Sequence, residues 1–118
     1  MPKTPVPDVY QRRSASAFAT LSSNLRLLSD PTRLAIVKHI SLSGEIRPSD
    51  LAVKVGIDRR RVSTQLAYLR IAGLLESRQE GQSVYYSIVP EAFESLASKI
   101  HGFAANALND RPQPESKP

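Results

Sequence analysis

The feature that most constrains this chain is a pair of short helical patterns separated by only a few residues. The first pattern covers residues 49–55. The apolar positions of the second step by four, three and four residues, through Val62, Leu66, Leu69 and Gly73. Such steps mark one face of an α-helix. The link between the patterns is Gly56-Ile57-Asp58. Two short helices joined by a tight glycine-containing turn predict a helix-turn-helix.

The second helix of this pair opens with an unusual run of cations: Arg59, Arg60 and Arg61. Asp58 precedes them in the N-cap position. A helix start carries partial positive charge, so each cation there destabilises the helix by about 0.3–1 kcal/mol. A polyanion bound at this end would make the electrostatic energy favourable instead. The same helix offers polar groups able to reach base edges and phosphates: Ser63, Thr64 and Gln65. The alternative interpretation is a solvated polar face with a chance arginine run.

Composition indicates one small domain with an anionic partner. The chain has 118 residues, a net charge of +5 and no cysteine, which excludes disulfides and thiolate metal sites. We find no apolar run long enough to span a bilayer and no secretory pattern, so we expect a cytoplasmic protein. No catalytic spacing of serine, cysteine or histidine and no glycine-rich phosphate loop is present. We therefore expect no enzyme activity and no cofactor.

Helices are predicted on both sides of the helix-turn-helix, together with a hairpin. The first helix begins between residues 8 and 13 and ends at Ser29; Asp30-Pro31 then starts the second, which stops before Gly44. A small strand could form at 45–47, and alternation predicts strands at 74–79 and 82–89. The last helix covers 91–109. The proline-containing ends, 1–8 and 110–118, are predicted to be disordered, which leaves 9–109 as the domain.

Apolar stripes on the first and last helices exceed what a small core can bury. We therefore predict that both helices form a homodimer interface. The residues assigned to this interface are Phe18, Leu21, Leu25, Leu96, Ile100, Phe103 and Ala107.

The segment from Leu25 to Ile88 resembles the arsenic-repressor (ArsR/SmtB) family of bacterial winged-helix repressors. The resemblance rests on the DPTRL string at Asp30, the V-S pair at Val62, the L-R-x-A-G-L exit from Leu69 and the V-Y-Y of the hairpin. It implies an α+β, mostly helical fold: a winged helix-turn-helix with a two-stranded wing and terminal dimerisation helices. It also implies a homodimer on two inverted DNA half-sites, with release by an inducer.

The resemblance assigns base reading to the arginine-rich helix and backbone or minor-groove contacts to the wing. The base-reading positions would be Arg59, Arg60, Ser63 and Thr64, and the wing contacts Arg78, Gln82 and Ser83. With the neighbouring polar groups, the predicted DNA-binding set is Ser49, Arg59, Arg60, Arg61, Ser63, Thr64, Gln65, Arg78, Gln82 and Ser83.

The metal sites familiar in that family are missing from this sequence. The positions of its Cys-x-Cys pair read Arg47-Pro48-Ser49, and the four ligand positions of its last helix read Pro90, Ala92, Phe103 and Asn106. None of these side chains is a competent ligand for zinc or similar metals. His101 has no second soft ligand nearby, so we expect no metal site. The roles of His101 and Tyr85 stay open.

The sequence as a whole predicts a repressor that binds double-stranded DNA as a homodimer and has no membrane partner. The inducer is unknown, and regulation does not use the family's usual metal sites. A different class stays open: a winged-helix module whose basic face binds RNA or an acidic protein.

Overall fold

The computed structural model describes residues 8–110, in which five helices and two strands follow one another along the chain. They are α1 (Asp8–Leu28), α2 (Pro31–Ser43), α3 (Pro48–Val55), α4 (Arg59–Ile71), β1 (Leu75–Glu80), β2 (Ser83–Ile88) and α5 (Pro90–Asp110). The predicted terminal segments lie outside the described residues, except that Asp8 is the first residue of α1 and Asp110 the last of α5.

Two helices start where the sequence predicts because aspartate side chains satisfy their first free N–H groups. The Asp30 carboxylate accepts the Arg33 N–H at 2.9 Å, and the Asp58 carboxylate accepts the Arg61 N–H at 2.9 Å. At the end of α4, Gly73 has φ +82°, a left-handed conformation that favours glycine. This turn directs the chain from α4 into the first strand.

The wing is an antiparallel hairpin whose register runs from Leu75 opposite Ile88 to Glu80 opposite Ser83. The strands differ from the predicted ones by one residue at each end. The strand expected at 45–47 is reduced to a single bridge. Ile46 donates its N–H to the Tyr86 carbonyl at 3.1 Å and accepts the Tyr86 N–H at 2.9 Å. This bridge attaches the wing to the α2–α3 connection.

One hydrophobic cluster joins α2, α3, α4 and the base of the wing. On α4, Val62, Leu66 and Leu69 are fully buried, which confirms the predicted face. The cluster consists of Ile36, Val37, Ile40, Ile46, Leu51, Val62, Leu66, Leu69, Leu74 and Leu75. Because these side chains come from every part of the winged helix-turn-helix, the orientation of α4 is fixed by the core of the whole domain.

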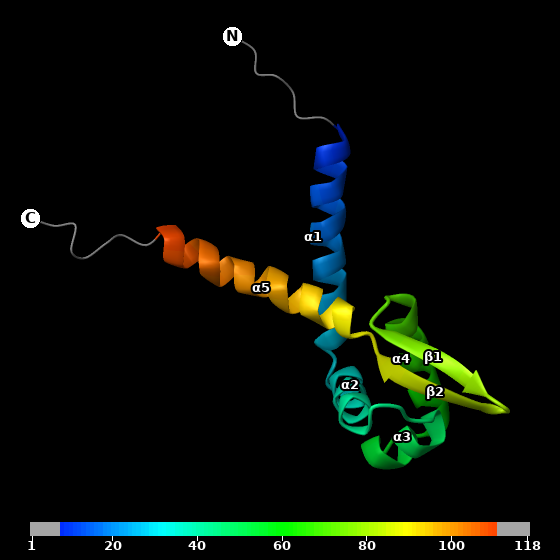
Figure 1. Ribbon diagram of the computed structural model, residues 1–118. Helices are drawn as coiled ribbons and strands as arrows, with labels where there is room; N and C mark the ends of the chain where they lie inside the picture. The colour runs from blue at the N-terminus through cyan, green and yellow to red at the C-terminus, as the bar shows by residue number, and fades with distance from the viewer. Residues whose placement is uncertain (1–7, 111–118) are drawn as a thin grey trace, which may run out of the picture.

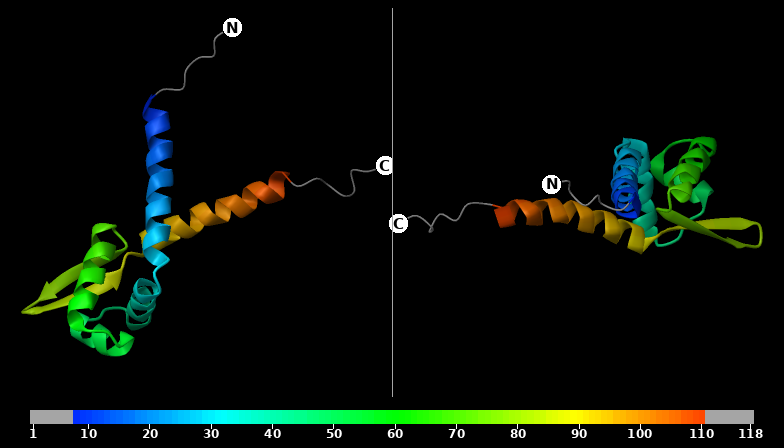
Figure 2. Two further views of the ribbon diagram at one scale, coloured as in Figure 1. Left: turned by 180° about the vertical axis from the view of Figure 1, so that it is seen from behind. Right: turned by 90° about the horizontal axis from the view of Figure 1, so that it is seen from above.

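The helices α1 and α5 extend beyond this domain and diverge from each other, as Figure 1 shows. The wing and α5 point to opposite sides of the molecule (Figure 2). The predicted interface stripe is unevenly buried: Leu21 is buried, Leu96 is half-buried, and the exposed members are Phe18, Leu25, Ile100, Phe103 and Ala107. None of the described helices is long and apolar enough to cross a bilayer.

The core position of α4 generates a stability prediction with a matched control. Leu66→Ala should lower the free energy of unfolding by about 2–5 kcal/mol, because it leaves a cavity in a fully buried site. Leu42→Ala makes the same chemical change on α2, where the leucine is 73% exposed. It should change the free energy of unfolding by no more than about 0.5 kcal/mol. Urea denaturation followed by circular dichroism measures both, and equal losses would contradict the assigned core.

Candidate nucleic-acid interface

A polar groove of about 390 Å³ lies between the start of α3, the start of α4 and the wing. Half of the residues predicted to contact DNA line it: Ser49, Arg59, Ser63, Gln82 and Ser83. The other lining residues are Arg47, Pro48, Val84 and Tyr86. The fold therefore brings together three segments that are separate in sequence, and their hydrogen-bonding groups face one hollow.

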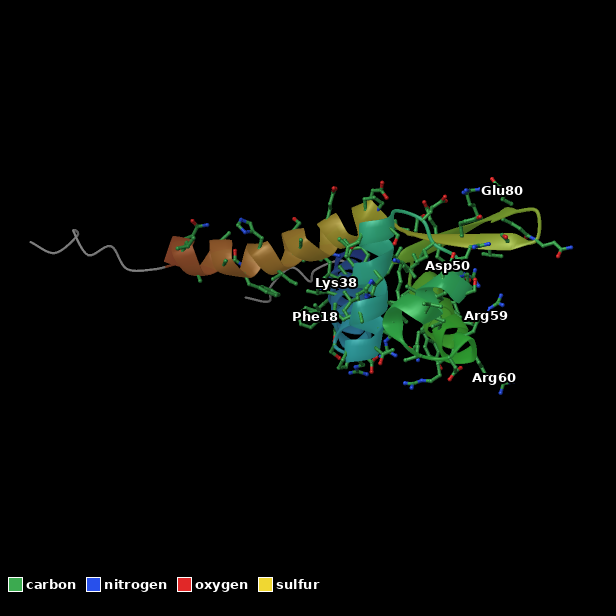
Figure 3. The ribbon with its side chains drawn as sticks, turned by 90° about the horizontal axis from the view of Figure 1, so that it is seen from below. Phe18, Lys38, Asp50, Arg59, Arg60 and Glu80 are labelled. Carbon is green, nitrogen blue, oxygen red and sulfur yellow. The ribbon has the colours of Figure 1, made fainter. Side chains whose placement is uncertain are left out.

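The remaining polar residues of α4 point in other directions because successive helical residues are rotated by about 100°. Arg60 and Thr64 lie opposite the buried face formed by Val62, Leu66 and Leu69, and both are exposed. Arg59 and Arg60 project outward from α4 on the side of the molecule away from α5 (Figure 3). The Thr64 hydroxyl donates to the Arg60 carbonyl at 3.1 Å. This outward face is the part of α4 that a large anion can approach.

Gln65, also predicted to contact DNA, is half-buried and serves as an acceptor inside the protein. The Arg33 guanidinium donates from Nη1 to Gln65 Oε1 at 2.9 Å and from Nε to the Leu27 carbonyl at 2.7 Å. Arg33 thereby joins the last turn of α1 to the middle of α4. The sequence contains no local signal for this link, because Arg33 and Gln65 are 32 residues apart.

Arg78, predicted to contact DNA from the wing, is bonded to two carboxylates. Its Nε lies 2.6 Å from Glu45 Oε2 and its Nη1 lies 3.0 Å from Glu80 Oε1. The hydrogen bond from Arg78 lowers the pKa of the Glu45 carboxyl below its usual value, and the same bonds raise the pKa of Arg78. Sequence reasoning missed Glu45, which stands 33 residues before its partner.

Positive charge is concentrated on α3 and α4. Between Arg47 and Arg70 the sequence has six cations and two acids, a net charge of +4. Between Leu74 and Val89, Arg78 is the single cation against Glu76 and Glu80, a net charge of −1. Sequence reasoning also left Arg47 out of the DNA-binding set, although it borders the groove and pairs with Asp50 at 3.1 Å. Its position two residues before Ser49, which was predicted to contact DNA, could have indicated this role from the sequence.

The residues at the metal-site positions of the ArsR/SmtB family do not fit a metal. Arg47, Pro48 and Ser49 stand at the start of α3, and Pro90, Ala92, Phe103 and Asn106 are spread along α5. Within residues 8–110, no group of three or more His, Cys, Asp or Glu side chains could hold a metal ion. His101 is exposed on α5.

Comparison with known proteins identifies a family. Residues 30–77 match the family model described as bacterial regulatory protein, arsR family. The chain is 38% identical over 75 residues to the arsenical resistance operon repressor of Escherichia coli K12, covering 64% of this chain and 63% of that protein. The match thus spans a little less than two thirds of that relative.

A second relative and a solved structure extend the likeness over more of the chain. Nodulation protein NolR of Rhizobium meliloti is 30% identical over 91 residues, which is 75% of this chain and 74% of that protein. An ArsR-like transcriptional regulator from Rhodococcus sp. RHA1 superposes with a TM-score of 0.70 at 25% identity, covering 77% of this chain and 85% of that one. These matches confirm the resemblance and the winged helix-turn-helix fold, and the chain belongs to the arsR family of bacterial regulatory proteins.

Proposed function

We propose that this chain is a transcriptional repressor that binds, as a homodimer, an operator of two inverted half-sites in duplex DNA. The observation that carries the proposal is the exposed, arginine-rich start of α4 beside the polar groove. An α-helix with its side chains is about 10–12 Å wide, and the major groove of B-DNA is about 12 Å wide. Membership of a family of transcriptional regulators supports the same function and speaks against an enzyme.

In the proposed complex, α4 lies in the major groove and the wing lies over the adjacent backbone or minor groove. Arg60 and Thr64 face the bases, since they lie opposite the buried face of α4. Arg59 and Ser63 line the polar groove of the protein together with Gln82 and Ser83 of the wing. Ser49 at the start of α3 is suited to a phosphate contact. Arg61 lies on the flank of α4 that leads to Gln65 and is proposed to contact the backbone.

The alternative is that the basic face binds RNA or an acidic protein. A-form RNA has a deep, narrow major groove that α4 cannot enter. Selection of bound duplexes from a random pool should therefore enrich a palindromic DNA site, and double-stranded RNA should not compete for it. If the selection returns no preferred sequence and RNA competes equally, the alternative is correct. The cytoplasmic location expected from the sequence stays a prediction.

A homodimer through α1 and α5 is supported by the apolar side chains that those helices expose. Phe18 is 68% and Phe103 is 56% exposed, and both line an apolar hollow of about 320 Å³ between the two helices. Removing such surface from water contributes about 25 cal/mol per Å². A solved winged helix-turn-helix domain with a similar fold is homodimeric.

The specificity prediction compares two neighbouring arginines. Arg60→Ala should weaken the free energy of DNA binding by about 1–3 kcal/mol, because a paired contact to guanine is removed. It should also reduce the preference for one base over the others at one base pair per half-site. Arg61→Ala should weaken binding to all sequences alike. It should also lower the salt slope, which is the slope of log affinity against log salt concentration, by about one. Affinity is measured for single-base operator variants at several salt concentrations. An unchanged ranking of those variants for Arg60→Ala, with only the slope altered, would show that the assigned helix face is wrong.

The dimer prediction uses the exposed residues of the two helices. Phe18→Glu combined with Phe103→Glu should give a folded monomer, and its affinity for a two-half-site duplex should fall on the order of a hundredfold, since avidity is lost. Leu42→Glu introduces the same charge at another exposed apolar position on α2 and should leave the dimer intact. Analytical ultracentrifugation measures the oligomeric state. A wild-type monomer at micromolar concentration would refute the proposal.

The regulatory prediction concerns the family's usual metals. Zinc, nickel, cobalt or arsenite at a few equivalents should leave DNA affinity unchanged, because the corresponding positions hold no competent ligands. Fluorescence anisotropy with a labelled operator measures this effect. A tenfold loss of affinity, equal to about 1.4 kcal/mol of coupling, would reveal a metal site.

A further inference from the structure

The surroundings of Arg78 in the wing are unusual for a residue expected to contact phosphate. Its Nε and Nη2 donate to the two carboxylate oxygens of Glu45, at 2.6 and 2.9 Å, in the paired geometry that guanidinium and carboxylate groups favour. Its Nη1 donates to Glu80 at 3.0 Å, and its Cζ lies 4.8 Å from the centre of the Tyr85 ring. Isolated exposed ion pairs contribute little, whereas networks with paired geometry can hold a conformation.

These contacts connect the wing to the α2–α3 connection at a second point. The first point is the backbone bridge between Ile46 and Tyr86. Glu45 precedes Ile46 in the α2–α3 connection, and Arg78 pairs with Tyr85 across the hairpin, one step nearer the tip than Tyr86. Leu74 and Leu75 hold the base of the wing in the core. The bond between Arg78 and Glu45 restrains a part of the hairpin that lies nearer the tip.

The local charge also argues against a phosphate contact by Arg78. Its two carboxylate partners together carry more charge than the guanidinium, so this cluster is net negative. A phosphate could bind Arg78 only by replacing bonds that are already made, close to two acids. The groups of the wing that border the groove beside Arg59 and Ser63 are instead neutral: Gln82, Ser83, Val84 and Tyr86.

We infer that Arg78 is a positioning residue that sets the angle of the wing against α4 through Glu45, and that it is not a phosphate ligand. The inference rests on the proposed function, since the wing angle matters only if Gln82 and Ser83 must reach DNA together with α4. Glu45 then acts with Arg78 as one unit, although it carries the same sign of charge as DNA.

The first variants keep charge or shape while breaking the paired bonds. Arg78→Lys retains the cation but cannot reproduce the fork of two donors to Glu45. Its affinity for the selected operator duplex should fall about fivefold with the salt slope unchanged. Glu45→Gln should weaken binding to a similar extent, although it removes a negative charge. The double variant should bind no more weakly than either single variant, because both remove the same interaction.

The matched control is Glu76→Gln, the same chemical change as Glu45→Gln, made on β1, the strand that carries Arg78. Glu76 is exposed and forms no salt bridge with any described residue. Its affinity should stay within about twofold of the wild-type value, since it holds no part of the wing in place. As a second measurement, amide hydrogen exchange at Ile46 and Tyr86, whose N–H groups form the bridge to the wing, should accelerate in Arg78→Lys and Glu45→Gln but not in Glu76→Gln.

Three results would overturn the inference. Wild-type affinity in Arg78→Lys would show that the paired bonds to Glu45 are not needed for binding. Tighter binding by Glu45→Gln would show that Glu45 competes with phosphate for Arg78. Unchanged amide exchange in both variants would show that the wing does not depend on their bond. A wild-type protein that binds no duplex would instead refute the proposed function, before any variant is compared.

Discussion

The structure depends on the burial of one face of α4. Val62, Leu66 and Leu69 are fully buried and pack with Ile36 and Ile40 of α2, Leu51 of α3, and Leu74 and Leu75 at the base of the wing. A close-packed core resists rotation of any one helix, because each rotation would create cavities and overlaps. The outward direction of Arg60 and Thr64 therefore follows from contacts on the opposite side of the same helix.

One part of the proposed interface supplies positive charge, and another part is bonded in place. The segment from Arg47 to Arg70 carries a net charge of +4 and supplies attraction, although three of its cations stand at a helix start where the backbone dipole disfavours them. The wing carries a net charge of −1 and is bonded to the α2–α3 connection through Arg78 and Tyr86. Electrostatic attraction grows with the number of phosphates neutralised, whereas the choice of sequence depends on where side chains meet base edges.

The apolar faces of α1 and α5 raise a separate question, that of assembly. Leu21 is buried within one chain, while Phe18, Ile100 and Phe103 stay exposed on helices that diverge (Figure 1). Arg33 connects the last turn of α1 to Gln65 of α4 by hydrogen bonds of 2.7 and 2.9 Å. If α1 joins two copies, as proposed, this link ties the interface between the copies to the helix that meets DNA. The spacing of the two copies of α4 in such a dimer would then depend on Arg33.

The sequence by itself determined the helices, the hairpin and the buried face of α4, because caps, turns and periodicity are local signals. Asp30 and Asp58 cap the helices that they were predicted to start, and Gly73 ends α4 as expected. Residue types, together with the family resemblance, also pointed to five of the nine residues that line the groove: Ser49, Arg59, Ser63, Gln82 and Ser83. Only the tertiary structure decided the partners of Gln65 and Arg78 and reduced the strand at 45–47 to one bridge. Those contacts join residues more than 30 positions apart, and a side chain's free donors and acceptors do not reveal which distant group will reach them once the core has packed.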